Sequence, residues 1–171
     1  MSEKELESIN FSSGDDLTDT EKLMPLKTHA KLKQINCVYT NLNDAGLQII
    51  AKINSLENLN LQGTPITNTG ISYLTSLENL KFLRLKECEL IDDQCLLDLN
   101  KIKNLEELEI QETQITARGL SYLSNENLKL IVLEISNNNF EQTNLLEFSK
   151  QLPNCEILVK GEGIIKNGKL E

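Results

Sequence analysis

Apolar residues recur along this chain in the pattern L-x-x-L-x-L, which is followed by a polar turn and a second apolar cluster. The stretch LENLNLQGTPITNTGISYL at 56–74 is repeated at 105–123 as LEELEIQETQITARGLSYL, with eleven of nineteen positions identical. Successive copies start 24, 24, 25 and 25 residues apart. A fixed period of about two dozen residues is typical of a solenoid. The anchor triplets are Leu32-Ile35-Cys37, Leu56-Leu59-Leu61, Leu80-Leu83-Leu85, Leu105-Leu108-Ile110 and Leu130-Leu133-Ile135.

Each copy predicts a short strand, a turn and a helix. The x-L-x-L core alternates apolar with polar residues, as a strand with one buried face does. After the turn, residues such as Leu47, Ile50 and Ile53 follow at helical spacing. A unit this small cannot bury its apolar face alone, so neighbouring copies must stack. We expect parallel strands on the inner curve and helices on the outer one.

This pattern resembles the leucine-rich-repeat family over residues 6 to about 165, in the variant seen in short bacterial repeats and in repeats attached to F-boxes. The resemblance implies an α/β right-handed solenoid with a parallel inner sheet and outer helices. We expect one domain, 1–171, with repeats starting near 6, 32, 56, 80, 105, 130 and 154. Where the family usually has Asn or Cys, the chain has Thr40, Thr64, Cys88, Thr113 and Asn138.

Glycines recur near the predicted helix starts. Gly46, Gly70 and Gly119 occupy equivalent positions, and Cys95 stands in that column in the third copy. Glycine serves there either because two segments pack closely or because the backbone has a positive φ. The residue types leave both readings open.

The residues between the anchors point away from the core, and stacking sets equivalent ones side by side. One outward column should contain Asn10, Asn36, Asn60, Arg84, Glu109 and Glu134. A second should contain Ser8, Gln34, Asn58, Phe82, Glu107 and Val132. A third, just after the last anchor, should contain Ser12, Val38, Gln62, Lys86, Gln111 and Ser136. The first half of this surface is therefore neutral and rich in amides.

The second half combines charge with apolar side chains. Lys81, Arg84 and Lys86 should lie beside Glu106, Glu109 and Glu112 of the next copy. These charges either neutralise one another across the strands or meet a partner. Phe82, Ile131 and Val132 are apolar residues at positions where the pattern predicts exposure to solvent. Exposed apolar and aromatic side chains beside charged ones are typical of the centre of an interface. We predict that the partner-binding residues are Tyr39, Phe82, Arg84, Lys86, Glu107, Glu109, Val132 and Glu134.

Composition narrows the partner class. The net charge of −9 and pI near 4.7 argue against nucleic acid and against an anionic membrane, both of which require clustered Lys and Arg. They are compatible with a basic protein partner. The N-terminus lacks an apolar signal segment, and Cys37, Cys88, Cys95 and Cys155 lack the close spacing of a zinc site. Free buried thiols in a reducing cytoplasm are expected.

The sequence therefore predicts a cytoplasmic, non-enzymatic protein-binding module that is monomeric on its own and has no cofactor or metal. An alternative within the same class is a stand-alone inhibitor or immunity-type protein that neutralises a cationic toxin or enzyme. A competing class is an enzyme with an atypical site at His29, the only histidine, or at a cysteine. Neither has a catalytic partner in a recognisable motif.

Overall fold

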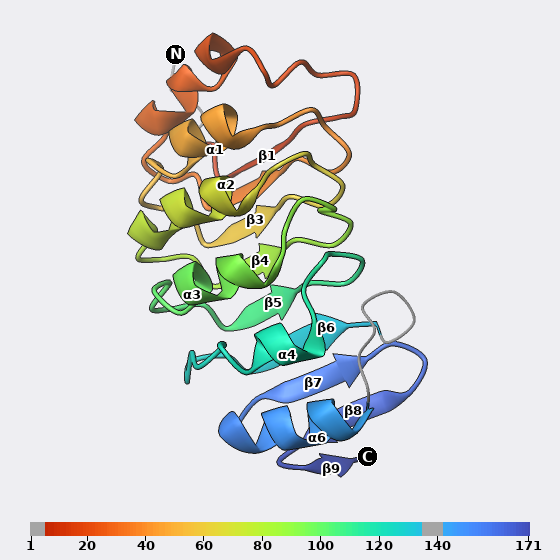
Figure 1. The fold of residues 1–171 in the computed structure, drawn as a ribbon. Helices are drawn as coiled ribbons and strands as arrows, with labels where there is room; N and C mark the ends of the chain where they lie inside the picture. Colours follow the sequence, from red (N-terminus) through yellow and green to blue (C-terminus); the bar gives the residue numbers. More distant parts are fainter. Residues whose placement is uncertain (1–5, 135–141) are drawn as a thin grey trace.

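The computed structural model describes residues 6–134 and 142–171. Its described strands form a single sheet of nine, in chain order. The strands β1 to β7 are parallel, whereas β8 and β9 turn back antiparallel at the C-terminal end (Figure 1). Their bounds are β1 Ser8–Asn10, β2 Gln34–Asn36, β3 Asn58–Asn60, β4 Phe82–Arg84, β5 Glu107–Glu109, β6 Leu130–Leu133, β7 Glu156–Val159, β8 Gly163–Lys166 and β9 Lys169–Leu170.

Short helices cover one face of this sheet and leave the other face open (Figure 1). The α-helices are α1 Asp44–Ile50, α2 Asn68–Tyr73, α3 Leu96–Leu99, α4 Ala117–Leu120 and α6 Gln142–Gln151. The 3₁₀ turns are η1 Thr20–Lys22, η2 Met24–Thr28, η3 Leu74–Ser76 and η4 Asp93–Cys95. The described helices are all too short or too polar to cross a lipid bilayer. This architecture confirms the predicted solenoid of stacked strand–turn–helix units.

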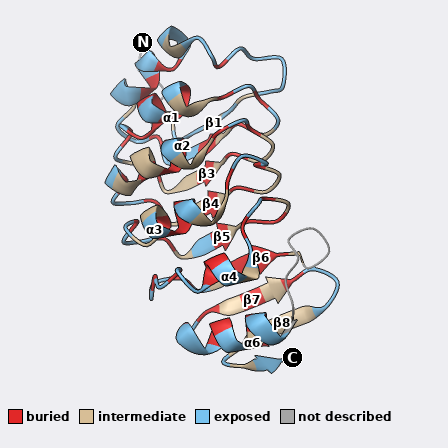
Figure 2. Ribbon diagram, in the orientation of Figure 1, coloured by how far each residue is buried: buried red, intermediate tan, exposed pale blue. Residues whose placement is uncertain are grey.

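The core runs the length of the solenoid between the sheet and the helices (Figure 2). The predicted strand anchors of the first full copies, such as Ile35, Leu59 and Leu108, are 0% exposed. The helix positions Leu47 and Ile50 are also fully buried and contact the same cluster. The strand period of two and the helix period of 3.6 thus supply the two sides of one aliphatic core.

Polar contacts join each repeat to the next at the helix starts. The carboxylate of Asp44 accepts hydrogen bonds from the backbone N–H and the hydroxyl of Thr67, at 2.8 and 2.6 Å. Asp93 holds Thr116 in the same way, at 2.7 and 2.8 Å. Because Thr67 and Thr116 are the N-caps of α2 and α4, each acidic residue stabilises the start of the following helix.

Close packing explains the column of helix glycines. None of Gly46, Gly70 and Gly119 is among the positive-φ residues. A Cβ at Gly119 would overlap the carboxylate of Asp93. The positive-φ residues within the repeats lie instead in the turns after β2 to β5, at Tyr39, Gly63, Glu87 and Glu112, and four more lie near the C-terminal end, at Gly161, Gly163, Asn167 and Gly168. Close packing is therefore the correct reading of the glycine column.

The threonines of the turn column bond within their own repeat. The buried hydroxyls of Thr40 and Thr64 donate to the carbonyl three residues earlier, at 2.8 and 2.7 Å, and Thr113 does so at 2.9 Å. The thiol of Cys88 instead reaches back to the carbonyl of Leu61 in the preceding repeat, at 3.1 Å. Asn138 lies outside the described residues.

The register of β6 corrects the predicted columns. Ile131 pairs with Leu108 and is the inward anchor, so Val132 lies beside Glu109 and Leu130 beside Glu107. Residues 128–135 contain two overlapping L-x-x-L-x-L frames, Leu128-Ile131-Leu133 and Leu130-Leu133-Ile135. The structure uses the first frame. Ile135 and Ser136 lie outside the described residues.

A buried side chain anchors the loop that leads into this frame. Asn125, which is 6% exposed, donates to the carbonyls of Ile102 and Leu99 at 2.9 and 3.4 Å. These bonds anchor the preceding loop against the third repeat and leave Leu128 as the first inward residue, 1% exposed. The closing copy follows the same register, since Ile157 pairs with Ile131.

Candidate protein-binding face

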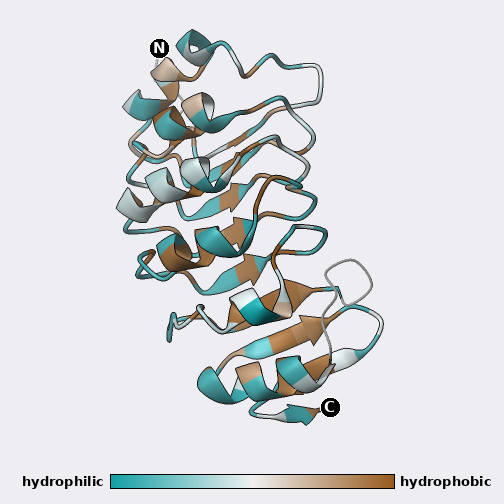
Figure 3. Ribbon diagram, in the orientation of Figure 1, coloured by the Kyte–Doolittle hydropathy of each residue, from teal (hydrophilic) through white to brown (hydrophobic). Residues whose placement is uncertain are grey.

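The candidate site is the face of the sheet that the helices leave uncovered. The register aligns one outward row along Gln34, Asn58, Phe82, Glu107 and Leu130. A second row runs along Asn36, Asn60, Arg84, Glu109 and Val132. Hydropathy changes along the sheet, from mixed strands to the predominantly apolar β6 and β7 (Figure 3).

A polar hollow of about 260 Å³ lies at the centre of this face. Its lining residues are Gln34, Asn36, Asn58, Asn60, Phe82, Leu83, Arg84, Glu107 and Glu109. The amide oxygens of Asn36 and Asn60 accept the N–H of the residue two positions later, each at 3.1 Å. This arrangement fixes the two amides and leaves their NH₂ groups as donors.

Arg84 is incompletely satisfied in this hollow. Its Nη1 lies 3.4 Å from Oε1 of Glu109, which is a long ion pair. Its Nε atom is buried and has no hydrogen-bond partner in the described structure. An orphaned buried donor costs about 1–3 kcal/mol.

Other charges on this side neutralise one another. Lys86 lies 2.8 Å from Glu87 and 3.2 Å from Glu112, and the hydrogen bond to Glu87 raises the pKa of Lys86. The expected pairs Arg84–Glu109 and Lys86–Glu112 are therefore confirmed. Cross-strand neutralisation thus accounts for part of the charge in this region.

A separate charge column lies just before the strands. Lys81 lies beside Glu106, as expected, and the backbone N–H of Glu106 donates to the carbonyl of Lys81 at 2.8 Å. The ammonium of Lys81, however, pairs with Glu57 at 3.1 Å. Glu106 pairs instead with Lys129, at 2.7 Å. Glu57 is also 2.9 Å from Lys33, and hydrogen bonds from Lys33 and Lys81 lower its pKa.

The structure divides the predicted binding residues into two groups. Phe82, Arg84, Glu107 and Glu109 line the central hollow. Phe82 is half-buried, and the Glu109 side chain is 29% exposed, so neither is sealed in the interior. Their outward placement agrees with the alternation in the sequence.

The other predicted residues lie elsewhere. Tyr39 and Lys86 are in the turns after β2 and β4, where the hydroxyl of Tyr39 donates to Glu87 at 2.6 Å. Val132, expected to be exposed, is only 8% exposed, and Ile131 is fully buried. Glu134 follows β6 and is half-buried.

Sequence reasoning missed two outward residues. Leu130 takes the outward position next to Glu107 because the frame of β6 differs from the expected one. Glu87 is the second missed residue, and its carboxylate accepts a hydrogen bond from the hydroxyl of Tyr39, which lies 48 residues earlier in the chain. The signal for Glu87 was its place in the turn column two residues after the last anchor, the position that Tyr39 also occupies.

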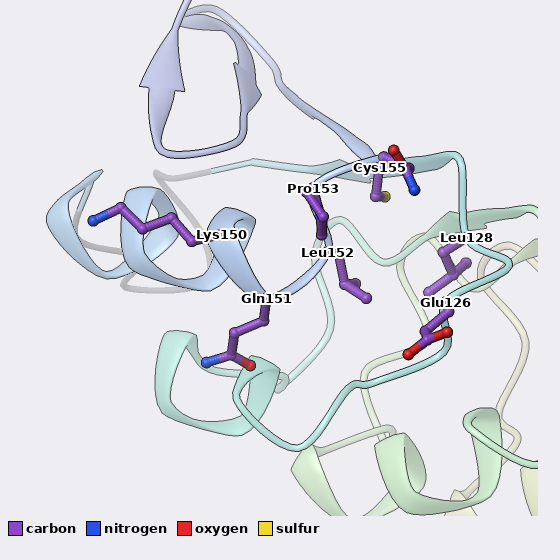
Figure 4. A pocket seen from close by; sticks show the side chains of 8 residues that line it. Glu126, Leu128, Lys150, Gln151, Leu152, Pro153 and Cys155 are labelled. Carbon is purple, nitrogen blue, oxygen red and sulfur yellow. The ribbon is translucent and has the colours of Figure 1, made fainter.

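A larger hollow of about 500 Å³ lies near the C-terminal end, beyond α6 (Figure 4). Cys155 is on its wall, and burial raises the pKa of that thiol to about 12. Lys150 and Gln151 point away from Cys155 (Figure 4). The thiol therefore stays protonated at neutral pH, and the arrangement does not activate it as a nucleophile.

The remaining cysteines are equally inert. Burial raises the pKa of Cys37 to about 12 and of Cys88 to about 11, and it also raises the pKa of Cys95. All four are free and buried. Among residues 6–134 and 142–171, no cluster of three or more His, Cys, Asp or Glu side chains is placed to hold a metal ion.

Known proteins resemble the chain in structure. No protein-family model and no curated protein matches it. Internalin C2 from Listeria monocytogenes str. 4b F2365 is 26% identical at a TM-score of 0.60, and the match covers 79% of this chain and 54% of that chain. A leucine-rich-repeat protein of Leptospira interrogans is 21% identical at a TM-score of 0.55, with coverages of 77% and 38%.

A third match is a chain in the crystal structure of the Rad7 and Elc1 complex in yeast. It is 18% identical at a TM-score of 0.62, over 90% of this chain and 42% of that one. This chain thus spans about half or less of the length of each match. The repeat period, the stacked parallel strands and these matches agree, and the chain has the leucine-rich-repeat fold.

Proposed function

We propose that this chain is a non-enzymatic module that binds a protein partner on the open face of its sheet. The observation that carries the proposal is the central hollow, where half-buried Phe82 lies beside Arg84 with its unsatisfied Nε. Aromatic and arginine side chains are enriched among the residues that dominate binding energies. The structural match to a chain solved in the Rad7 and Elc1 complex adds a protein of this fold that occurs in an assembly.

The physical advantage of this face is its rigidity. The outward side chains are presented by short strands whose neighbours Leu83 and Leu108 are packed in the core. A partner therefore orders few flexible groups on binding, which reduces the entropic cost. We include Glu107, Glu109 and Leu130 in the contact surface, at the centre of the sheet.

A second candidate function is a stand-alone inhibitor that covers a cationic toxin or enzyme. The observation in its favour is the net charge of −9, which would speed association with a basic protein. In both cases we propose a cytoplasmic monomer that forms a single domain over 1–171. The two candidates differ in whether the partner loses activity in the complex.

Affinity capture with the purified chain, followed by calorimetry with the identified partner, tests the proposal. Phe82→Ala should weaken binding at least 10-fold, as expected for a central aromatic residue. Glu109→Lys should also weaken the binding of a basic partner. Leu97→Ala is the matched control, because Leu97 is an apolar residue on α3 that is 58% exposed. Loss of binding with Leu97→Ala but not with Phe82→Ala would place the interface on the helices and contradict the proposal.

A further inference from the structure

A third hollow, called here the edge hollow, lies at the edge of the solenoid, in the turns that follow β2 to β4. It has a volume of about 460 Å³. Tyr39, Pro65 and Leu90 form its exposed apolar walls, and Tyr39 and Leu90 are each 52% exposed. Glu87 and Glu89 supply its carboxylates. Apolar walls and acidic groups are thus combined in one concave site, outside the central hollow described above.

The aromatic wall is held in place. The ring of Tyr39 lies against Gly63, and a Cβ on that glycine would be 2.6 Å from Cε1 of the ring. The hydroxyl of Tyr39 donates to Oε2 of Glu87 at 2.6 Å. The amide of Gln62 donates to the Tyr39 oxygen and to Oε1 of Glu87, each at 3.0 Å. Three neighbouring repeats therefore fix one ring and one carboxylate before any ligand arrives.

The charge at this edge is in acidic excess. Lys86 is the cation that contacts both Glu87 and Glu112. Glu89 is exposed, and within the described part of the chain its carboxylate has no ion pair and no hydrogen bond. Glu89 also borders a second, shallower hollow that it shares with Glu112. Two of the three carboxylates at this edge, those of Glu87 and Glu112, contact Lys86, and the carboxylate of Glu89 is the one left for a partner.

We propose that this edge hollow binds a single arginine or lysine side chain of the protein partner. The aliphatic stem would lie along Pro65 and Leu90, as long cationic side chains do on apolar surfaces. The charged head would contact the carboxylate of Glu89 and the face of Tyr39. The inference rests on the proposed function for its biological partner, and it adds a site and a chemical requirement to it.

A peptide titration tests the site without knowledge of the partner. The probe is acetyl-Gly-Arg-Gly-Arg-Gly-amide, and the matched control peptide carries citrulline, which has the same shape without the charge. Backbone amide resonances are followed in the full chain by NMR. The arginine peptide should shift Tyr39, Gly63 and Leu90, more weakly as the salt concentration rises. Equal binding of the citrulline peptide, or shifts confined to other residues, would overturn the proposal.

Two matched variants sharpen the result. Glu89→Gln should weaken the arginine peptide about 2- to 5-fold, the range of an exposed ion pair. Glu78→Gln makes the same charge change at another exposed carboxylate that has no side-chain partner in the described chain, and it should leave the affinity unchanged. If the two variants lost equal affinity for the arginine peptide, the net charge of the protein would explain the effect, and the proposed site would be refuted.

The failure of this inference is distinguishable from failure of the proposed function. With an identified partner, weaker binding by Phe82→Ala and unchanged binding by Glu89→Gln would refute the edge hollow and support the sheet face. Weaker binding by Glu89→Gln and unchanged binding by Phe82→Ala would support the edge hollow and refute the sheet face as the main interface.

Discussion

The ring of Tyr39 occupies the space that a side chain at Gly63 would need. The two residues hold the same place in successive repeats, the turn two residues after the last strand anchor. Both have a positive φ, 53° for Tyr39 and 65° for Gly63. Glu87 and Glu112 have the same conformation at this position with full side chains. Glycine is thus required at 63 mainly because its neighbour is a tyrosine.

Gly63→Ala should displace the ring of Tyr39. Because that ring is half-exposed, it can swing outward, and the main loss is its hydrogen bond to Glu87. Gly161→Ala is the control, since Gly161 has a φ of 80° but nothing within 4 Å of an added Cβ. We expect Gly63→Ala to lower the free energy of unfolding by about 0.5–1.5 kcal/mol more than the control, in chemical denaturation.

A spectroscopic pH titration of the Tyr39 hydroxyl also detects the displacement of its ring. The hydrogen bond to Glu87 raises the pKa of Tyr39 above its ordinary value of 10.0. Gly63→Ala should therefore lower that pKa, whereas Gly161→Ala should not. In a Tyr39→Ala background, Gly63→Ala should cost no more than Gly161→Ala. An undiminished cost there would show that the backbone, and not the ring, requires glycine.

Gly119→Ala should weaken the junction between the third and fourth repeats. The new Cβ would push the Asp93 carboxylate away from Thr116, which caps α4. Loss of these two hydrogen bonds should lower the free energy of unfolding by about 1–2 kcal/mol. In an Asp93→Ala background the same change should be neutral or stabilising, because alanine favours helix over glycine by about 1 kcal/mol. Additive costs in this double-mutant cycle would contradict the mechanism.

The ion pairs of Glu57 should give a pH-dependent contribution to stability. Lys33 and Lys81 lower its pKa from the ordinary 4.5, so the stabilisation is present above pH 4.5 and is lost as pH falls through the lowered pKa. Glu57→Gln should therefore be less stable than the wild type near neutral pH, and the gap should close in acid. Glu78→Gln provides the comparison, because it makes the same charge change at an exposed carboxylate that has no ion pair in the described part of the chain.

The four thiols should resist modification in the native state. Burial raises their pKa values, so little thiolate exists at neutral pH and access is blocked. A disulfide reagent such as 5,5′-dithiobis(2-nitrobenzoic acid) should react with all four only after addition of denaturant, at a rate set by unfolding. One thiol that reacts much faster in the native chain would reopen the case for a cysteine-based activity.

The fold was predictable because its information is local and repeated. Ile35, Leu59 and Leu108 each occur in a strand pattern of period two, and the copies recur at a nearly constant interval. A strand buried on one face must place alternate residues in the core. Stacking then follows, since no single repeat can bury its own apolar face. The outward positions of Phe82, Arg84 and Glu109 follow from the same alternation.

Contacts between repeats were decided by tertiary structure. Two frames fit the pattern at β6, and the structure uses the one that begins at Leu128, after a loop that the buried amide of Asn125 bonds to the third repeat. Lys81 has acidic neighbours on two sides, and the structure pairs it with Glu57. Tyr39 meets Glu87 only because two intervals of the solenoid bring their turns within reach. Outside β6, the sequence by itself determined which strand residues face inward, because burial depends on local alternation. Only the tertiary structure decided which outward residues meet, because loop lengths and side-chain reach act between repeats.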